Sequence, residues 1–188
     1  MKDRTIRDGG KTKGRRIIWK ILSVTAVILW AIVIFRFSAQ QGTESSGISG
    51  RICYGIVSAY SDLFHRNLSE SQIIAAAEKI QFPVRKGAHM SEYAMLALLL
   101  FHALCAFDMP DGKIKYLFTL LIVAVYAASD EIHQLFIPGR AGSGRDVLID
   151  TAGGAIMLLI IFGIRYTLFH RKNVKESKSR KEKRVAQN

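Results

Sequence analysis

The sequence contains only two cysteines, Cys53 and Cys105, among its 188 residues. The order of the apolar segments described below places the two thiols at opposite faces of a membrane. Because a disulfide needs Cα atoms within about 7 Å of each other, we expect no internal disulfide. The chain also lacks the G-x-S-x-G and H-E-x-x-H sequences of serine hydrolases and zinc proteases, so no standard motif assigns an enzymatic activity.

Features of a cleaved leader and of a repeat protein are missing as well. The first apolar run is too long for the core of a signal peptide, and the FRFSAQQG that ends it offers no A-x-A cleavage site. No self-similarity occurs at the period of a solenoid. We therefore expect the first run to stay in the protein as a membrane anchor.

Four apolar runs dominate the chain, although hydrophobic residues make up only 49% of it. Each run has about 20 residues, the length that crosses a bilayer as an α-helix. The sequence therefore predicts an all-α membrane protein, a bundle of four transmembrane helices. The predicted spans cover residues 17–37, 86–107, 116–136 and 147–169.

Positive charge is concentrated at the two ends of the chain. Of the 27 Lys and Arg residues, eight lie in residues 1–20 and nine in residues 165–188. Because positively charged flanks stay in the cytoplasm, we expect both basic tails, residues 1–16 and 170–188, to be cytoplasmic in a bacterial plasma membrane protein. The tails would contact the bilayer through anionic lipid headgroups. They carry no interleaved aromatic residues and no nucleic-acid motif, so nucleic-acid binding is not expected.

The longest connection, residues 38–85, would then lie outside the cytoplasm. Residues 38–50 are rich in Ser, Gly and Gln, which predicts a loop. Apolar side chains at every fourth position from Ile52 to Phe64 predict an amphipathic helix that lies on the membrane surface.

A second short helix is predicted over residues 70–80. Ser69 and Gln72 have the spacing of a capping box at its start. Pro83 is expected to end it. The two short helices either cover a site or only complete the bundle.

Ionisable side chains inside the predicted spans gather at one end of the bundle. Spans two, three and four alternate in direction, and their polar ends all face away from the cytoplasm. A charged group facing lipid costs about 2.5–3.5 kcal/mol, so these groups should face one another or a ligand. The residues expected to form this outer-leaflet ligand site are Lys86, His89, Glu92, Tyr93, Asp130, Glu131, His133, Gln134, Arg140, Arg145, Asp146 and Asp150.

The loop GRAGSGRD at residues 139–146 has the features of an anion site. Its three glycines allow the backbone to approach a ligand, and its two arginines offer paired donors. The start of the following helix would point free N–H groups at the same place. A phosphate or a carboxylate is the expected ligand. Alternatively, the arginines pair only with the carboxylates of Asp130, Glu131 and Asp146.

Two further chemistries remain open at this site. His89 and Glu92, with Asp130 and His133 in the antiparallel neighbour, could supply four ligands to zinc or iron, although such spacing is common by chance and no metal is expected. A carboxylate beside a histidine could instead serve a hydrolase or transferase acting on a lipid-linked headgroup. The candidate catalytic residues are these four and Asp150. A third alternative is purely structural, with the charges only joining the helix ends. The sequence does not identify a cofactor.

Two segments resemble the VanZ-like family of bacterial membrane proteins. They are RKGAHMSEY at residues 85–93 and SDEIHQLFIPGRAGSGRDVLIDTAGG at residues 129–154, and FSAQ at residues 37–40 is similar to the early signature of that family. The resemblance covers residues 17–169 and leaves out the basic tails. All of the predicted site residues except Arg145 fall on positions of the family pattern.

The resemblance implies a small polytopic helical protein with a role in the cell envelope. The founding member of the VanZ-like family is linked to low-level resistance to teicoplanin, a glycopeptide antibiotic that acts on cell-wall precursors. By resemblance, a cell-wall precursor or a glycopeptide is the implied ligand. The implied function is thus envelope maintenance or lowered sensitivity to glycopeptides.

Overall fold

The computed structural model describes the backbone of residues 2–185 and the side chains of residues 14–173. All regular structure in this part of the chain is helical. The five helices are α1 (Lys2–Ser38), α2 (Gly42–Leu63), α3 (Glu70–Ala106), α4 (Lys113–Gln134) and α5 (Gly144–Val185). Four helical segments within the described residues are long and apolar enough to cross a membrane: Gly14–Ser38, Glu70–Ala106, Lys113–Gln134 and Gly144–Asn173. The protein is therefore an all-α, multi-pass membrane protein, as the sequence predicts.

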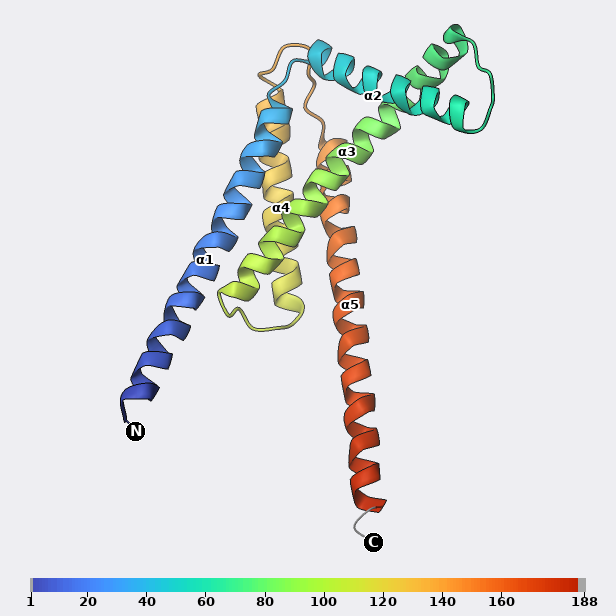
Figure 1. Cartoon of the computed structure of the whole chain (residues 1–188). Helices are drawn as coiled ribbons and strands as arrows, with labels where there is room; N and C mark the ends of the chain where they lie inside the picture. Colours follow the sequence, from blue (N-terminus) through green and yellow to red (C-terminus); the bar gives the residue numbers. More distant parts are fainter. Residues whose placement is uncertain (1, 186–188) are drawn as a thin grey trace.

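The helices form a bundle from which a hairpin projects (Figure 1). The bundle consists of α1, α4, α5 and the second half of α3. The projecting α2–α3 hairpin consists of α2 and the first part of α3, residues 42–84. The start of α1 and the end of α5 lie at the opposite end of the bundle from α2. We call the two ends the hairpin end and the tail end.

Close contact between α3 and α5 fixes the centre of the bundle. A Cβ atom on Gly153 would lie 2.2 Å from the carbonyl oxygen of Met90, and one on Gly154 would lie 2.9 Å from a methyl group of Val123. The glycine pair therefore lets α5 pack closely against neighbouring helices. The buried apolar core around this contact consists of Ile34, Tyr93, Leu96, Ala97, Phe101, Val123, Ala127 and Leu158.

The predicted loop over residues 38–50 is wrong, because α2 already begins at Gly42. The N–H of Gly42 donates to the carbonyl oxygen of Pro138 at 3.2 Å. Further along the helix, the side-chain amide of Gln81 in α3 donates to the carbonyl oxygen of Ser46 at 2.7 Å and to the hydroxyl of Ser49 at 2.8 Å. These tertiary contacts hold a Ser- and Gly-rich segment in a helix that its weak propensity does not predict.

The predicted stop at Pro83 is also wrong. The capping box at Ser69 and Gln72 is confirmed, but α3 then runs from Glu70 through Pro83 to Ala106. Pro83 lacks an N–H and loses one helical hydrogen bond. Packing compensates on both sides, since residues 73–84 contact α2 and the segment from Tyr93 onward lies in the bundle core.

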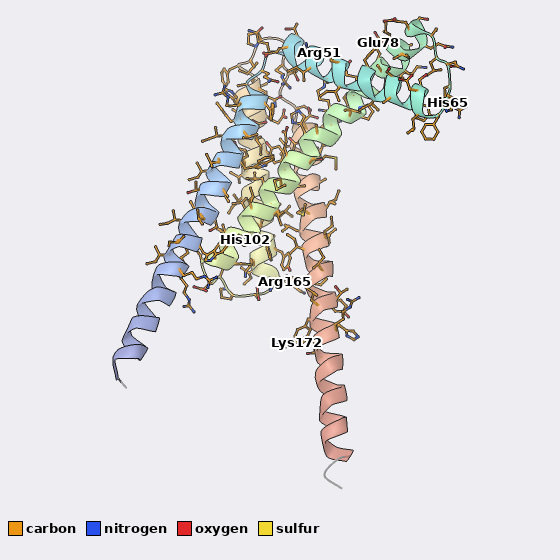
Figure 2. The ribbon with its side chains drawn as sticks, in the orientation of Figure 1. Arg51, His65, Glu78, His102, Arg165 and Lys172 are labelled. Carbon is orange, nitrogen blue, oxygen red and sulfur yellow. The ribbon has the colours of Figure 1, made fainter. Side chains whose placement is uncertain are left out.

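The face of α2 that packs against α3 differs from its predicted apolar stripe. Cys53 and Val57 are buried against α3. Ile52, Ile56 and Tyr60 remain about half exposed, at 53%, 48% and 46%. Figure 2 shows the labelled side chains of the hairpin lying away from the bundle. The exposed stripe is consistent with a helix at a membrane surface, which stays a prediction.

A charged cluster joins three elements at the tail end. Asp111, in the turn between α3 and α4, accepts from Lys115 Nζ at 2.8 Å and from Arg165 Nη2 at 2.7 Å. The hydrogen bond from Lys115 and the nearby charge of Arg165 lower the pKa of the Asp111 carboxyl below its usual value, against the opposing effect of desolvation. The cluster therefore ties the turn to α4 and α5. Of the two free thiols, Cys105 lies beside it, and Cys53 lies in the hairpin.

Candidate functional site

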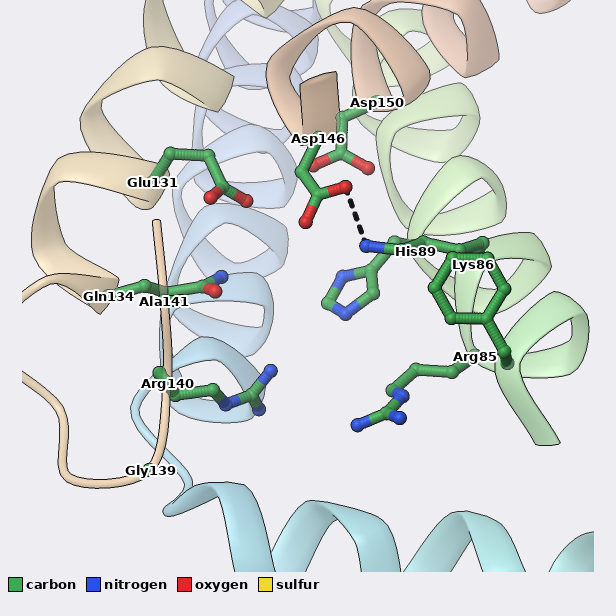
Figure 3. A pocket seen from close by; sticks show the side chains of 11 residues that line it. Arg85, Lys86, His89, Glu131, Gln134, Gly139, Arg140, Ala141, Asp146 and Asp150 are labelled. Atoms are coloured by element: carbon green, nitrogen blue, oxygen red, sulfur yellow. Dashed lines mark ion pairs between the residues drawn. The ribbon is translucent and has the colours of Figure 1, made fainter. Parts of the chain in front are cut away.

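A polar cavity of about 220 Å³ lies at the hairpin end of the bundle. Four segments build it: α3, the end of α4, the loop after α4 and the start of α5 (Figure 3). Its lining residues are Phe82, Arg85, Lys86, His89, Glu131, Gln134, Gly139, Arg140, Ala141, Asp146 and Asp150. Seven of the twelve predicted site residues are among them. Segments far apart in the sequence thus deliver ionisable groups to one place.

The carboxylates of the cavity differ in how they are paired. Asp146 forms an ion pair with Lys86 at 2.6 Å. Glu131 accepts a hydrogen bond from the backbone N–H of Ser143 at 2.7 Å. Asp150 is only 3% exposed, and within the described part of the chain its carboxylate forms neither a hydrogen bond nor an ion pair. The cavity therefore contains one carboxylate that is buried and unpaired.

The two arginines of the cavity lie on the side of α2. Arg140 donates from Nε to the carbonyl oxygen of Gln40 at 3.1 Å and from Nη2 to that of Phe37 at 3.3 Å. Arg85 reaches the hydroxyl of Ser46 at 3.5 Å, the limit of a hydrogen bond. Figure 3 shows the two guanidinium groups reaching toward each other from opposite walls. Burial, together with the charge of Arg85, lowers the pKa of Arg140, although an arginine stays protonated at physiological pH.

His89 links the cavity to a carboxylate behind it. Its Nδ1 atom lies 3.5 Å from Glu92 Oε2, one helical turn further along α3. This distance allows an ion pair, but the geometry is not that of a hydrogen bond, and Glu92 Oε2 has no hydrogen-bond partner among the described residues. Glu92 does not line the cavity.

Three further predicted site residues lie in the bundle rather than in the cavity. Tyr93 is fully buried and Asp130 is 4% exposed. Gln134 joins Asp130 to α1, donating to Asp130 Oδ2 at 3.2 Å and to the Ser38 hydroxyl at 3.0 Å. His133 stacks on Phe35 of α1, with ring centroids 4.5 Å apart. The structure therefore places Tyr93, Asp130 and His133 behind the cavity wall.

The comparison with protein families agrees with this architecture. The model of the family described as VanZ/LLP1 matches residues 23–169. The chain belongs to the VanZ/LLP1 family. The comparisons with curated proteins and with solved structures give no match. The matched region includes every residue of the cavity and leaves out the basic tails.

The glycines of the 139–146 loop serve backbone packing in this VanZ/LLP1 protein. Gly139 has a φ of +72°, a conformation that favours glycine, and lies against Gly42. A Cβ atom on Gly142 would lie 2.3 Å from the carbonyl oxygen of Glu131, whereas Gly144 has open space around it. At Gly139 and Gly142, the lack of a side chain therefore lets the backbone pack against other parts of the protein, rather than against a ligand as predicted.

The alternative that the loop arginines pair with neighbouring carboxylates is wrong. Arg140 donates two hydrogen bonds to the backbone carbonyls of Phe37, at the end of α1, and of Gln40, just beyond it. These bonds place a positive charge at the negative end of that helix. The side chain of Arg145 is exposed and does not line the cavity. Within the described residues, neither arginine forms an ion pair. One amino group of Arg140 therefore remains for a ligand.

The four residues weighed for zinc or iron do not converge. The described residues hold no group of three or more His, Cys, Asp or Glu side chains placed to bind a metal ion. His89 lies near Glu92, Asp130 contacts Gln134, and His133 stacks on α1. Of the five candidate catalytic residues, only His89 and Asp150 line the cavity.

Four cavity residues of this family member were not among the predicted site residues: Phe82, Arg85, Gly139 and Ala141. Gly139 and Ala141 lie in the predicted anion-binding loop, whereas Arg85 and Phe82 were missed. Arg85 begins the RKGAHMSEY segment and precedes His89 by four positions, so the two lie on one face of α3. The predicted span began at residue 86, which placed Arg85 in a connection. Recognising that α3 continues through Pro83 would have identified both residues.

Proposed function

We propose that this protein binds an anionic group of a cell-envelope molecule in the cavity at the hairpin end. The observation that supports the proposal is the arrangement of Arg85 and Arg140. Their guanidinium groups approach each other from opposite walls, and neither forms an ion pair within the described part of the chain. Two like charges brought together in a cavity that is partly shielded from water favour an anion between them.

The proposal includes an orientation in which the hairpin end faces outward from the bacterial plasma membrane. The start of α1 and the end of α5 lie at the other end of the bundle and carry most of the basic residues. Positive flanks remain in the cytoplasm. The cavity then lies at the level of the outer leaflet, where envelope lipids and lipid-linked precursors present their headgroups.

In this position, the protein would take part in envelope function or lower sensitivity to teicoplanin-type glycopeptides. Membership of the VanZ/LLP1 family and the likeness to the VanZ-like pattern support this role. Binding of a cell-wall precursor, or of the glycopeptide itself, would change how much antibiotic reaches its target.

Replacing Arg85 with glutamine tests the proposed anion site. Among the described residues, Arg85 makes a single marginal hydrogen bond, to Ser46, so the variant should fold normally but lose a charge-assisted bond to the ligand. We expect affinity for glycerophosphate, measured by calorimetry on the purified protein, to fall about tenfold or more. Expression of this variant in a susceptible host should also fail to raise teicoplanin tolerance, whereas the wild type raises it.

The matched control is Arg51→Gln, an exposed arginine on α2 away from the bundle (Figure 2). It should retain wild-type affinity and tolerance. Equal behaviour of the Arg85 and Arg51 variants, at equal protein levels in the membrane, would contradict an anion site between the two cavity arginines.

Cysteine labelling tests the orientation. In a background with Cys53 and Cys105 replaced by serine, Glu78→Cys on the hairpin should react with a membrane-impermeant maleimide in intact cells. Lys172→Cys near the end of α5 should react only after permeabilisation. Both positions are exposed, so accessibility of the thiol itself does not limit the reaction. The reverse pattern would place the cavity on the cytoplasmic side and remove the outer-leaflet ligand.

A further inference from the structure

We infer that the ligand is zwitterionic, with its anionic group between Arg85 and Arg140 and a primary ammonium group on the carboxylate of Asp150. This inference rests on the proposed function and specifies the class of ligand for the same cavity. The chemical class is a phosphate monoanion joined by a short linker to an ammonium, as in a phosphoethanolamine headgroup.

The charges that line the cavity are balanced in number. Three cationic side chains and three carboxylates line it: Arg85, Lys86 and Arg140 against Glu131, Asp146 and Asp150. These six groups sum to a formal charge of zero, and His89 lies beside a carboxylate of its own, Glu92. A multiply charged anion would bring uncompensated negative charge into this site, which is costly away from water. A zwitterion leaves the site neutral.

Only some of these charged side chains have partners within the protein. Lys86 and Asp146 neutralise each other, and Glu131 accepts from a backbone N–H. Within the described residues, Glu131, Asp150 and the two arginines form no ion pair, and of the two carboxylates only Asp150 also lacks a hydrogen bond. A ligand that satisfies them must therefore carry both signs of charge.

The unpaired arginines and the unpaired Asp150 lie at different ends of the cavity. Figure 3 shows Arg85 and Arg140 on the side of α2 and Asp150 on the side of α5, with His89 between them. Because Asp150 is almost fully buried, its carboxylate gains strongly from a cation that can also donate hydrogen bonds. A primary ammonium meets both requirements, whereas a quaternary ammonium has no N–H to donate.

The size of the cavity limits how much of the ligand it holds. Its 220 Å³ is below the roughly 300–1,000 Å³ of sites for drug-sized molecules and equals about seven water volumes of about 30 Å³ each. It therefore accepts a headgroup, with the rest of the molecule outside. Phe82 lines the cavity and is 62% exposed, and the hairpin also exposes the apolar stripe from Ile52 to Tyr60. This surface suits a lipid-anchored molecule.

Binding of small soluble headgroups to the full-length protein in phosphatidylcholine nanodiscs tests the inference. Wild-type protein should bind glycerophosphoethanolamine about tenfold or more tightly than glycerophosphate or glycerophosphocholine. Asp150→Asn should abolish this preference, because the amide cannot neutralise the ammonium. Arg85→Gln should weaken binding of all three phosphates and leave the order of affinities unchanged.

The remaining outcomes distinguish failure of the zwitterionic ligand from failure of the anion site itself. Glycerophosphate binding as tightly as glycerophosphoethanolamine to the wild type would overturn the zwitterion and leave the anion site standing. Equal binding of glycerophosphocholine would overturn the ammonium bond to Asp150. Failure of all three phosphates to bind would overturn both the inference and the proposed function.

A competition experiment with lipids identifies the source of the headgroup. Nanodiscs containing phosphatidylethanolamine should compete with the soluble probe and retain that lipid in native mass spectrometry, which supports a phospholipid headgroup. Competition by the free compound alone supports a soluble zwitterion of the same chemistry. In either case Asp150→Asn must make the ethanolamine compounds no better competitors than the choline compounds, and an ethanolamine advantage that persists in that variant would overturn the inference.

Discussion

Replacing Gly153 with leucine is expected to separate α5 from α3 and to abolish function. Even a single Cβ atom at this position would lie 2.2 Å from the carbonyl oxygen of Met90, which belongs to the backbone and cannot rotate away. Overpacking costs typically 1–3 kcal/mol where side chains can adjust, so we expect about 3 kcal/mol or more here. His89 precedes Met90, and Asp150 lies one turn before Gly153, so the cavity would be distorted as well.

Unfolding of the purified protein by SDS, followed by far-UV circular dichroism, measures this loss. Gly163→Leu is the matched control, because Gly163 lies in the same helix and a Cβ atom there would meet nothing within 4 Å. A leucine at this position should stabilise α5 by about 1 kcal/mol through helix propensity alone. Equal destabilisation by the two variants would show that the α3–α5 contact does not hold the bundle together.

Replacing Asp150 with asparagine is expected to make the protein more stable and inactive. The buried carboxylate has no protein partner in the described structure, so removing its charge removes a desolvation penalty. We expect a gain of about 1 kcal/mol or more, because an unsatisfied buried charge costs at least as much as an unsatisfied polar group. For a protein of this size, this corresponds to a rise of about 2–4 °C in melting temperature.

Asp146→Asn provides the contrast for this experiment. Asp146 lies one turn before Asp150 and forms the 2.6 Å ion pair with Lys86, so its loss leaves a lysine without its partner. Thermal unfolding followed by intrinsic fluorescence should therefore show the Asp146 variant melting below the wild type and the Asp150 variant above it. A lower melting temperature for Asp150→Asn would identify Asp150 as a structural group rather than a ligand-binding one. A variant that is more stable but has lost function is expected where the replaced residue serves binding rather than folding.

The sequence by itself determined the membrane architecture and the place of the cavity. Apolar length fixes a spanning helix, because a bilayer has nearly constant thickness. Alternating direction then puts the polar ends of spans two, three and four at one face. The glycine pair at 153–154 and the capping box at Ser69 were also predictable, because each depends on a local pattern with a specific geometric requirement.

Only the tertiary structure decided which of these polar residues reach the cavity. Adjacent residues differ by about 100° around a helix, so Gln134 faces the cavity while His133 stacks on α1. The choice depends on how each helix is rotated against its neighbours, which sequence spacing alone does not fix.

Contacts between distant segments likewise decided the shape of the hairpin. Gly42 packs against Gly139, and packing on α2 and within the bundle carries α3 through Pro83. Arg140 caps the end of α1 because the fold brings the loop after α4 next to that end of the helix. Each of these features depends on residues that are far apart in the sequence, and local propensity carries no information about such partners.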